Sequence, residues 1–349
     1  MPEKKKISIH DLARELKVSS ATVSFVLNGK ASEKRISRAL ENKILKYAGK
    51  MGYRPNRIAK SLRTGKSRII CMLVEGISDP FFSSIARIIE EKAHQHDYKI
   101  FYSSTNNDTA ITRELIKVYR DSQVDGYIIA PPPGIEEDIQ SLMDDGLPVV
   151  LFDRYFPSMT THNVVVDNFN GAFQAVQHFL LNGYRHIGFV TLDSRQVQMT
   201  HRLNGYVKSM EDNRLDKYIL EIPFGRDRSV GVAKIRSFLE ENPVLDAVLF
   251  ATNYLAIDGL EAIDDLGLSI PGDVGVIGFD DNTHFSLFSP SITAVAQPVQ
   301  AISEEVIRKL MICLSGKEKD MPRETTILPV RLIARESAVA TGIRKLGPM

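Results

Sequence analysis

The sequence predicts an α/β protein in which a small all-helical N-terminal domain precedes a larger region built from two parallel-sheet subdomains. Three observations predict this fold class. Short amphipathic helical segments fill the first 52 residues, the remainder alternates β-branched runs with helical stretches, and the net charge changes sign between the two parts. A chain of 349 residues also exceeds the usual size of one domain.

The charge is distributed very unevenly. Residues 1–66 carry 17 Lys and Arg against 5 Asp and Glu, and the totals of 44 and 43 leave 27 against 38 for the rest. This asymmetry indicates that a polyanion meets the first part and not the second. We therefore divide the chain into a basic domain at 1–52, a hinge and linker at 53–66, and an acidic domain at 67–349.

The composition excludes several classes of protein. Cys71 and Cys313 are far apart in apolar surroundings, which is typical of buried side chains and not of a metal site or redox pair. The N-terminus MPEKKKIS lacks the apolar run of a signal peptide, and no stretch approaches the roughly 20 apolar residues of a membrane span. We expect a cytoplasmic protein without membrane segment, metal or cofactor.

The segment ISIHDLARELKVSSATVSFVLNGK predicts two short helices joined by a tight turn. Ser8 and Asp11 have the spacing of a capping box, Ser19 is placed to cap the second helix, and Asn28-Gly29 is typical of a left-handed helix end. A third amphipathic helix is expected from about Ile36 to Met51, with Leu45 and Met51 among its apolar residues. This is a helix-turn-helix, whose second helix enters the DNA major groove.

The second helix offers side chains for DNA. Ser20, Ala21, Ser24 and Phe25 share the face able to reach base edges, and Ser19 and Thr22 suit phosphates, which favour helix N-termini. Phe25 can contact a thymine methyl group but donates no hydrogen bond. The alternatives are that Phe25 packs against the third helix and that the domain binds protein or RNA. The residues expected at the DNA are Ser19, Ser20, Ala21, Thr22, Ser24, Phe25, Asn28, Tyr53, Asn56, Arg57, Ala59 and Leu62.

The hinge YRPNRIAKSLRTG predicts a further short helix. Pro55 ends the preceding helix, Asn56 can cap a helix from Arg57 to about Arg63, and Gly65 lets the chain leave it. An apolar stripe that includes Ala59 and Leu62, flanked by basic residues, resembles the wedges that open a minor groove. The alternative is a plain solvated linker.

The acidic domain predicts two parallel sheets covered by helices. The halves have similar lengths, and we expect four strands in each. The first four are Arg68–Val74, Lys99–Ser103, Gly126–Ala130 and Pro148–Phe152. The other four are Ile187–Thr191, Tyr218–Ile222, Ala247–Ala251 and Val274–Phe279.

Ligands of such sheets bind beyond the carboxyl ends of the strands, so polar residues just after strands are candidates. Both halves supply them, which predicts a ligand between the halves. Carboxylates, an amide and a guanidinium suit a polyhydroxylated molecule, and Phe81 or Phe82 can stack on a ring. The alternative is that the charged residues form salt bridges at loop mouths. The candidate effector residues are Ser78, Phe81, Phe82, Asp153, Arg202, Asn253 and Asp280.

Catalytic constellations are missing from the sequence. It contains no GxSxG elbow, no GxxxxGK[ST] loop and no paired Cys/His spacing of a metal site. We therefore expect a protein that is not an enzyme. The alternatives are a cytoplasmic sugar-processing or sugar-binding protein with a DNA-binding head, and a free-standing sugar receptor.

The segments VSSATVSFVLNG and GYRPNRIAKSL resemble the head and hinge of the LacI/GalR family of bacterial transcriptional regulators. The resemblance continues through ISDPFFSSIARIIE, VDGYIIAPP, PVVLFDR, VVVDNFNGA, NGYRHIGFV, RLNGY, VIGFDD and QPV. It implies a nucleoid-associated repressor that binds a pseudo-palindromic DNA operator as a homodimer, with Leu62 at the minor-groove wedge position. It also implies a small-molecule effector, by default a carbohydrate, with a nucleobase as the alternative.

The resemblance further implies a core like the periplasmic binding proteins, crossed three times by the chain. Lobe 1 is expected at about 67–163 plus 296–325, and lobe 2 at about 164–293 plus 328–343. Asp153, Arg202, Asn253 and Asp280 fall at effector-contact positions. Tyr254 stands where the family often has Asp, which indicates a different rim. The tail lacks a heptad run, so no tetramerisation element is expected.

Overall fold

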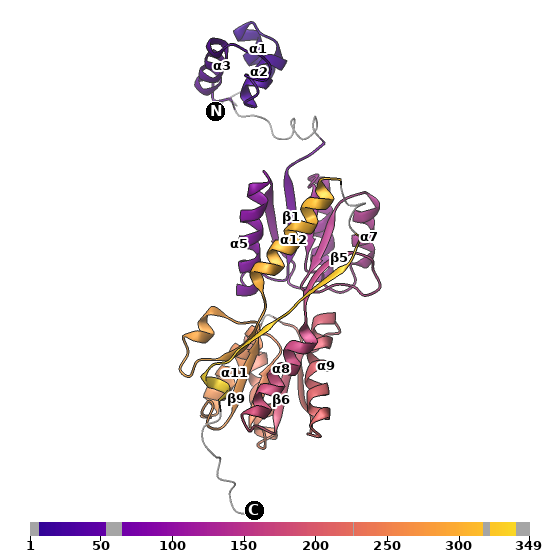
Figure 1. Cartoon of the computed structure of the whole chain (residues 1–349), viewed down its shortest axis with the longest axis vertical. Coiled ribbons are helices and arrows are strands. Elements are labelled where there is room, and N and C mark those ends of the chain that lie inside the picture. The colour runs from indigo at the N-terminus through magenta and orange to yellow at the C-terminus, as the bar shows by residue number, and fades with distance from the viewer. Residues whose placement is uncertain (1–6, 54–64, 226, 317–321, 340–349) are drawn as a thin grey trace, which may run out of the picture. The chain divides into compact units, whose positions relative to one another are not determined.

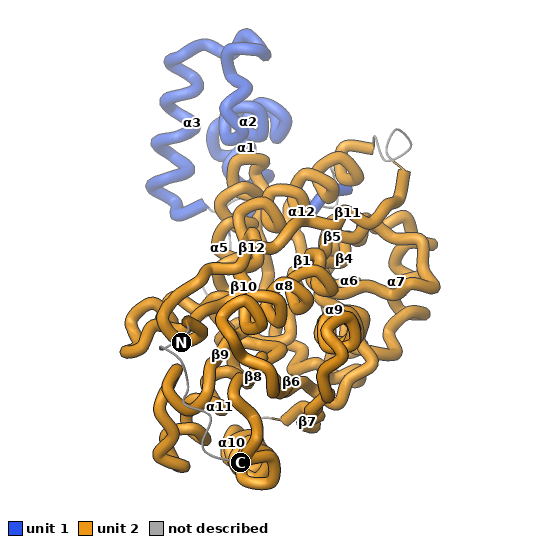
Figure 2. Tube along the Cα trace, turned by 60° about the horizontal axis from the view of Figure 1, so that its bottom comes forward, with its two compact units in different colours: residues 1–67 blue, residues 68–349 orange. Residues whose placement is uncertain are grey.

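The computed structural model describes residues 7–53, 65–225, 227–316 and 322–339. The chain forms two compact units, residues 1–67 and 68–349 (Figure 2). Each unit has its own hydrophobic core. The hinge residues Asn56, Arg57, Ala59 and Leu62 lie outside the described residues.

The first unit contains α1 (Ile9–Leu16), α2 (Ser20–Leu27) and α3 (Arg38–Lys50). The predicted capping box is present, since the Ser8 and Asp11 side chains each accept from the other residue's backbone N–H. Lys17 makes the turn with a φ of 55°, and Gly29 adopts the left-handed conformation after α2 while Asn28 does not. The helix-turn-helix prediction is confirmed.

The third helix differs in detail from the prediction. It begins at Arg38 and not at Ile36. Ser37 is its N-cap, and the Ser37 side chain accepts a hydrogen bond from the Leu40 backbone N–H. Ile44 and Ala48 are its buried residues, whereas Leu45 and Met51 are exposed. These two residues were expected in the core. They face solvent instead, unlike the buried Ile44 and Ala48.

The second unit consists of two six-stranded sheets, each flanked by helices (Figure 1). The order of the first sheet, which defines lobe 1, is β11-β5-β4-β3-β1-β2, and that of the second, which defines lobe 2, is β12-β10-β9-β8-β6-β7. All pairings are parallel except that of β10 with β12. The predicted fold class is therefore confirmed.

The elements of lobe 1 are β1 (Ile69–Val74), α5 (Pro80–Gln95), β2 (Lys99–Ser104), α6 (Thr109–Asp121), β3 (Gly126–Ile129), α7 (Glu136–Asp144), β4 (Val149–Phe152), β5 (His162–Val166), α12 (Val299–Leu314) and β11 (Thr325–Leu328). Those of lobe 2 are α8 (Asn168–Leu181), β6 (Ile187–Leu192), α9 (Val197–Asp212), β7 (Tyr218–Ile222), α10 (Arg228–Glu241), β8 (Ala247–Phe250), α11 (Asn253–Asp265), β9 (Gly275–Phe279), the 3-10 turn η1 (Thr283–Ser286), β10 (Thr293–Ala296), β12 (Arg331–Ile333) and the 3-10 turn η3 (Glu336–Ala338).

All eight predicted strands are present within a residue or two of their expected ends. Sequence reasoning missed β5, β10, β11 and β12, of which β11 and β12 form sheet edges. Since β5 pairs with β4 and β11, the first sheet extends to Val166 and Leu328. It thus reaches a few residues beyond the lobe boundaries expected near 163 and 325.

The last part of the chain returns to lobe 1 and then leaves it again. After β10, α12 packs against α5 on lobe 1, and the run through β11 and β12 passes from one sheet to the other (Figure 1). Together with the passage from β5 to α8, the chain crosses between the lobes three times. The second crossing lies near Ala296-Gln297-Pro298, where the family resemblance implied it.

Helices α8 and α9 pack so closely in lobe 2 that a glycine is required between them. A Cβ added to Gly205 on α9 would lie 2.1 Å from the backbone oxygen of Phe169 on α8. Backbone atoms cannot give way as a flexible side chain can, so the two helices would have to separate.

We predict that Gly205→Ala destabilises the core by roughly 1–3 kcal/mol, as overpacked sites do. Chemical denaturation followed by circular dichroism measures this loss. Gly49→Ala in α3 is the control, because its added Cβ meets nothing within 4 Å and lies in the other unit. An unchanged unfolding midpoint for Gly205→Ala would contradict the close approach of α8 and α9.

Candidate functional site

The N-terminal end of α2 is exposed and well capped. The Ser19 hydroxyl accepts a hydrogen bond from the Thr22 backbone at 3.0 Å and lies 2.8 Å from the Thr22 hydroxyl. Val23 and Val26 point into the core. Of the predicted base-reading residues, Ala21 is exposed and Ser20, Ser24 and Phe25 are partly exposed. The structure thus brings these four residues to the solvent side of the helix.

Phe25 and two further predicted DNA residues, Asn28 and Tyr53, have partners inside the head. The Asn28 amide donates to the Ser24 carbonyl at 2.7 Å. Phe25 is not part of the core of the head, and the Lys34 ammonium lies 5.2 Å from its ring centre. Tyr53 packs against that core, and burial raises its pKa. The alternative that Phe25 packs against the third helix therefore has no support in the described core of the head.

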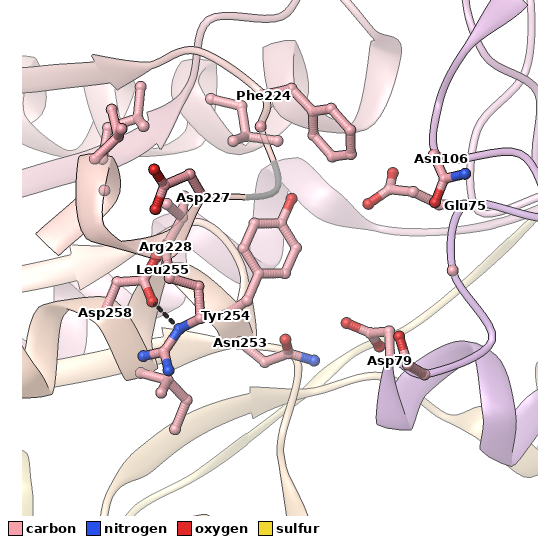
Figure 3. Close-up of a pocket in the computed structure, with 18 of the residues that line it drawn as sticks. Glu75, Asp79, Asn106, Phe224, Asp227, Arg228, Asn253, Tyr254, Leu255 and Asp258 are labelled. Carbon is pink, nitrogen blue, oxygen red and sulfur yellow. Dashed lines mark hydrogen bonds and ion pairs between the residues drawn. The ribbon is translucent and has the colours of Figure 1, made fainter.

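A cavity of about 580 Å³ lies between the two lobes, beyond the carboxyl ends of their strands (Figure 3). Lobe 1 contributes Glu75 after β1 and Asn106 after β2. Lobe 2 contributes the loop after β7, including Phe224, and the start of α11. This is the location at which parallel sheets bind ligands.

Two predicted effector residues, Ser78 and Asn253, line this cavity. Figure 3 shows Asn253 of lobe 2 opposite Asp79 of lobe 1, where its amide favours the charged form of the Asp79 carboxylate. Burial, together with the charges of Asp280 and Glu75, raises the pKa of Asp79 to about 6. Asp79 is therefore a partly buried carboxylate whose negative charge is poorly compensated.

Phe81 and Phe82 do not line the cavity. They are 8% and 5% exposed and belong to the core of lobe 1, where Phe82 makes an edge contact with Phe152. Their expected stacking on a ligand ring has no support in this structure. The aromatic side chains of the cavity wall are instead Phe224 and Tyr254 of lobe 2 (Figure 3).

Arg202 and Asp280 form an internal brace of lobe 2 and do not line the cavity. The Arg202 guanidinium donates to Asn168 at 2.8 Å and to the Ala251 carbonyl at 2.6 Å, and its Nη1 lies 3.5 Å from Asp280. It also stacks over the ring of Phe279. Burial raises the pKa of Asp280, although Arg202 opposes this shift.

Asp153, like Arg202 and Asp280, has its polar contacts inside the protein and does not line the larger cavity between the lobes. Its carboxylate accepts from Arg154 at 2.8 Å, and it lines a separate cavity of about 200 Å³. Asp153 and Asp280 follow β4 and β9 with φ values of 66° and 71°, a left-handed conformation that Asp tolerates better than most residues. In each lobe, an Asp with a left-handed backbone follows a strand and forms an ion pair with an arginine: Asp153 with Arg154, and Asp280 with Arg202.

Sequence reasoning missed several residues of the cavity wall. Two of them could have been found, because Glu75 directly follows β1 and Asn106 lies two residues after β2. The selected candidates were chosen for the same kind of position. Nothing in the local sequence singles out the others, which include residues near the start of α10 and on α11. The missed residues with polar or aromatic side chains are Glu75, Asn106, Phe224, Asp227, Arg228, Asp258 and Asn282.

Within the described ranges, no helix is both long and apolar enough to cross a membrane. In the same residues, no group of three or more His, Cys, Asp and Glu side chains is arranged to hold a metal ion.

Two protein-family models match this chain. Residues 8–56 match the model of bacterial regulatory proteins of the lacI family, and residues 176–338 match that of a periplasmic binding protein-like domain. Catabolite control protein A of Priestia megaterium is 30% identical, over 95% of this chain and 99% of its own. The HTH-type transcriptional regulator RegA of Clostridium saccharobutylicum is 31% identical with the same coverage.

Solved structures show the same fold. The lac repressor dimer bound to operator and the anti-inducer ONPF has a TM-score of 0.84 at 22% identity, covering 96% of this chain and 100% of that one. A LacI family transcriptional regulator from Enterococcus faecium with bound ribose has a TM-score of 0.70 at 24% identity, covering 78% and 98%. The head, the two-lobed core and the near-complete alignment with both regulators lead to one conclusion: this chain belongs to the lacI family of bacterial regulatory proteins.

Proposed function

We propose that this protein is a sequence-specific transcriptional repressor that binds a pseudo-palindromic operator as a homodimer. A small molecule held between the two lobes, a sugar by our proposal, controls it. One observation carries the proposal: a basic helix-turn-helix with an exposed reading face is joined in one chain to a core with a ligand-sized cleft. Its relatives are transcriptional regulators and not enzymes, and we propose no catalytic activity.

The charge of the head supports DNA as the partner. Residues 1–66 carry an excess of 12 positive side chains, from 17 basic and 5 acidic residues. Such a surface gains affinity for DNA by releasing counterions. The solved dimer on operator DNA, whose fold this chain shares, supports the homodimer. A DNA-bound regulator works in the cytoplasm at the nucleoid.

The composition of the cleft supports an uncharged, hydroxyl-rich effector. Glu75, Asp79, Asp227 and Asp258 line it, and these carboxylates accept hydrogen bonds from hydroxyl groups. In the described part of the wall, Arg228 is the basic side chain, and it already binds Asp258 at 2.7 Å and Glu261 at 3.0 Å. An anionic effector would therefore meet uncompensated negative charge. The ribose complex of a neighbour in fold is consistent with a sugar.

The remaining effector assignments stay proposals. Ser78 and Asn253 are proposed to contact the ligand directly. Asp153, Arg202 and Asp280 are proposed to act on the ligand only if ligand binding redirects their side chains, because internal partners hold them here. The hinge at 53–66 is proposed to pair between subunits on DNA, with Leu62 in the minor groove. Effector binding permits or prevents that pairing, which requires different affinities for the two states.

We predict that Ala21→Glu weakens operator binding by at least about tenfold, because it places a negative charge at the exposed start of α2 where phosphates and bases approach. Fluorescence anisotropy with DNA from upstream of the protein's own gene, titrated at several salt concentrations, measures the affinity. Asn42→Glu, which makes the same charge change on exposed α3, is the matched control. If both variants lose operator affinity equally, α2 is not the helix that reads the DNA.

We predict that Asn253→Ala abolishes the response to effector while operator affinity without effector stays within about twofold of wild type, since Asn253 is in the cleft and not in the head. Operator anisotropy with neutral pentoses and hexoses first identifies the sugar that changes binding, and the variant is then titrated with that sugar. Arg202→Ala is a poorer probe, because it leaves Asp280 buried without its cation. A wild-type dose-response in Asn253→Ala would show that the effector binds elsewhere.

We predict that Asp79→Asn raises the melting temperature of the ligand-free protein at pH 7.5. The folded-state pKa of Asp79, raised to about 6, means that this group destabilises the folded state increasingly between about pH 4 and 6, and fully above that range. The gain should therefore be only about half as large at pH 5, which lies between the unfolded and folded pKa values. Asn retains the N-cap of α5 that Asp79 provides. Differential scanning fluorimetry at both pH values tests this, and destabilisation at pH 7.5 would show that the charge is compensated.

A further inference from the structure

The side chain of Gln196 joins the two lobes at the edge of the cleft. Gln196 precedes α9 in lobe 2, at the N-cap position, but its side chain makes no capping hydrogen bond. Instead it reaches lobe 1. Its Nε2 donates to Asn107 Oδ1 at 3.0 Å, and its Oε1 accepts from Asn107 Nδ2 at 3.4 Å. Its Oε1 also accepts from Arg154 Nη1 at 3.0 Å.

Arg154 connects this contact to the wall of the cavity. Its guanidinium is 3% exposed and uses all three nitrogens. Nη2 donates to Glu75 at 2.7 Å, Nε donates to Asp153 at 2.8 Å, and Nη1 donates to Gln196. Burial alone would lower the pKa of Arg154, but Glu75 and Asp153 raise it, so the guanidinium stays charged.

The contact network therefore begins at the cavity wall in lobe 1 and ends at Gln196 in lobe 2. Glu75 and Asn106 line the cavity. Arg154 lies behind Glu75, and Asn107 is the next residue after Asn106. Asn106 and Asn107 have φ values of 53° and 56°, so this loop is held in a left-handed turn. An effector hydroxyl that binds Glu75 thus contacts the same carboxylate that holds Arg154 against Gln196.

We propose that Gln196, with Arg154 and Asn107, is a latch that sets how far the cleft closes and couples closure to effector binding at Glu75. These are positioning residues, because in this structure they do not line the cavity. The coupling to effector rests on the proposed function; the latch itself does not. A ligand that contacts both Glu75 and Asn253 binds the closed arrangement, and the latch stabilises that same arrangement.

The test measures lobe separation in the full-length protein without ligand. Spin labels at Glu137→Cys on α7 and Asn204→Cys on α9, both exposed positions, report the distance between the lobes by electron–electron double resonance. Cys71 and Cys313 are buried and do not compete for label. In Gln196→Ala we expect the distance distribution to shift to longer values. One net hydrogen bond corresponds to about a fivefold change in the closed-to-open ratio.

Gln198→Ala is the matched control. It removes the same side chain two residues later, where Oε1 is buried without a hydrogen-bond partner among the described residues, and its distances should match wild type. Asn107→Ala removes one lobe 1 partner of Gln196 and leaves Arg154, so its shift should have the same direction and be smaller. The double variant should add little to Gln196→Ala, because that variant already lacks the Gln196–Asn107 contact. Circular dichroism and thermal unfolding establish that each variant is folded.

If folded Gln196→Ala has the same inter-lobe distance distribution as wild type, the latch proposal is wrong. Normal operator and effector binding would not rescue it. Additive shifts from Gln196→Ala and Asn107→Ala also overturn it, since the residues would then act separately. Once the effector is known, Gln196→Ala should weaken its binding by about fivefold, the same factor. Failure of the wild type to bind operator would contradict the proposed function and leave the latch measurement valid.

Discussion

The carboxyl ends of both parallel sheets meet at one cleft, and this constraint organises the rest of the core. Parallel strands joined through helices place all their outgoing loops at one edge of the sheet. Because the chain passes between lobes three times, the two edges stay opposite each other while the connections between them remain few. Cavity, buried arginines and latch all lie at these strand ends. Ligand chemistry and lobe movement are therefore tied to the same loops.

The charged groups at these strand ends have two different tasks. Arg154 and Arg202 are 3% and 2% exposed. Arg202 donates to acceptors of its own lobe, and Arg154 donates to Glu75 and Asp153 of its own lobe and to Gln196 of the other. Burying such a group without partners would cost several kcal/mol, so these contacts maintain the shape of the lobe. Asp79 has no cationic partner among the residues that the structure describes, which keeps its charge available to a ligand. Groups that brace a lobe and groups that can bind an effector thus alternate along the same edge.

The fold could be predicted from sequence because its signals are local. The Ser19 cap, the β-branched runs and the charge reversal each lie within a few residues of the element they specify. The missed strands β5 and β11 pair with each other although they lie about 160 residues apart, and no local pattern reveals such a pairing. Edge strands such as β12 are also short and partly exposed, so they lack a continuous apolar run.

The site was harder to predict because chemistry alone does not identify a partner. A buried guanidinium at Arg202 does need an acceptor, but the protein supplies it through Asn168, the Ala251 carbonyl and Asp280. Phe81 and Phe82 follow the Asp79 cap, and the resulting rotation of α5 turns them toward the sheet. Gln196 gave no signal, since its position at a helix start predicts a cap and not a contact with another lobe. Such details depend on the placement of elements distant in sequence.

A latch of modest strength suits a protein that must respond to a ligand. Moving an equilibrium from 1:99 to 99:1 requires a difference in binding free energy of about 5.5 kcal/mol between the two states. If internal contacts held the cleft closed by more than a ligand can add, occupancy would change nothing. If they were absent, the ligand would have to supply the whole cost of closing. The neutral hydrogen bond of Gln196 to Asn107 contributes about 1 kcal/mol, and the one from the charged Arg154 guanidinium about 1.5–3 kcal/mol. These contributions leave the two arrangements close enough in free energy for a small effector to decide between them.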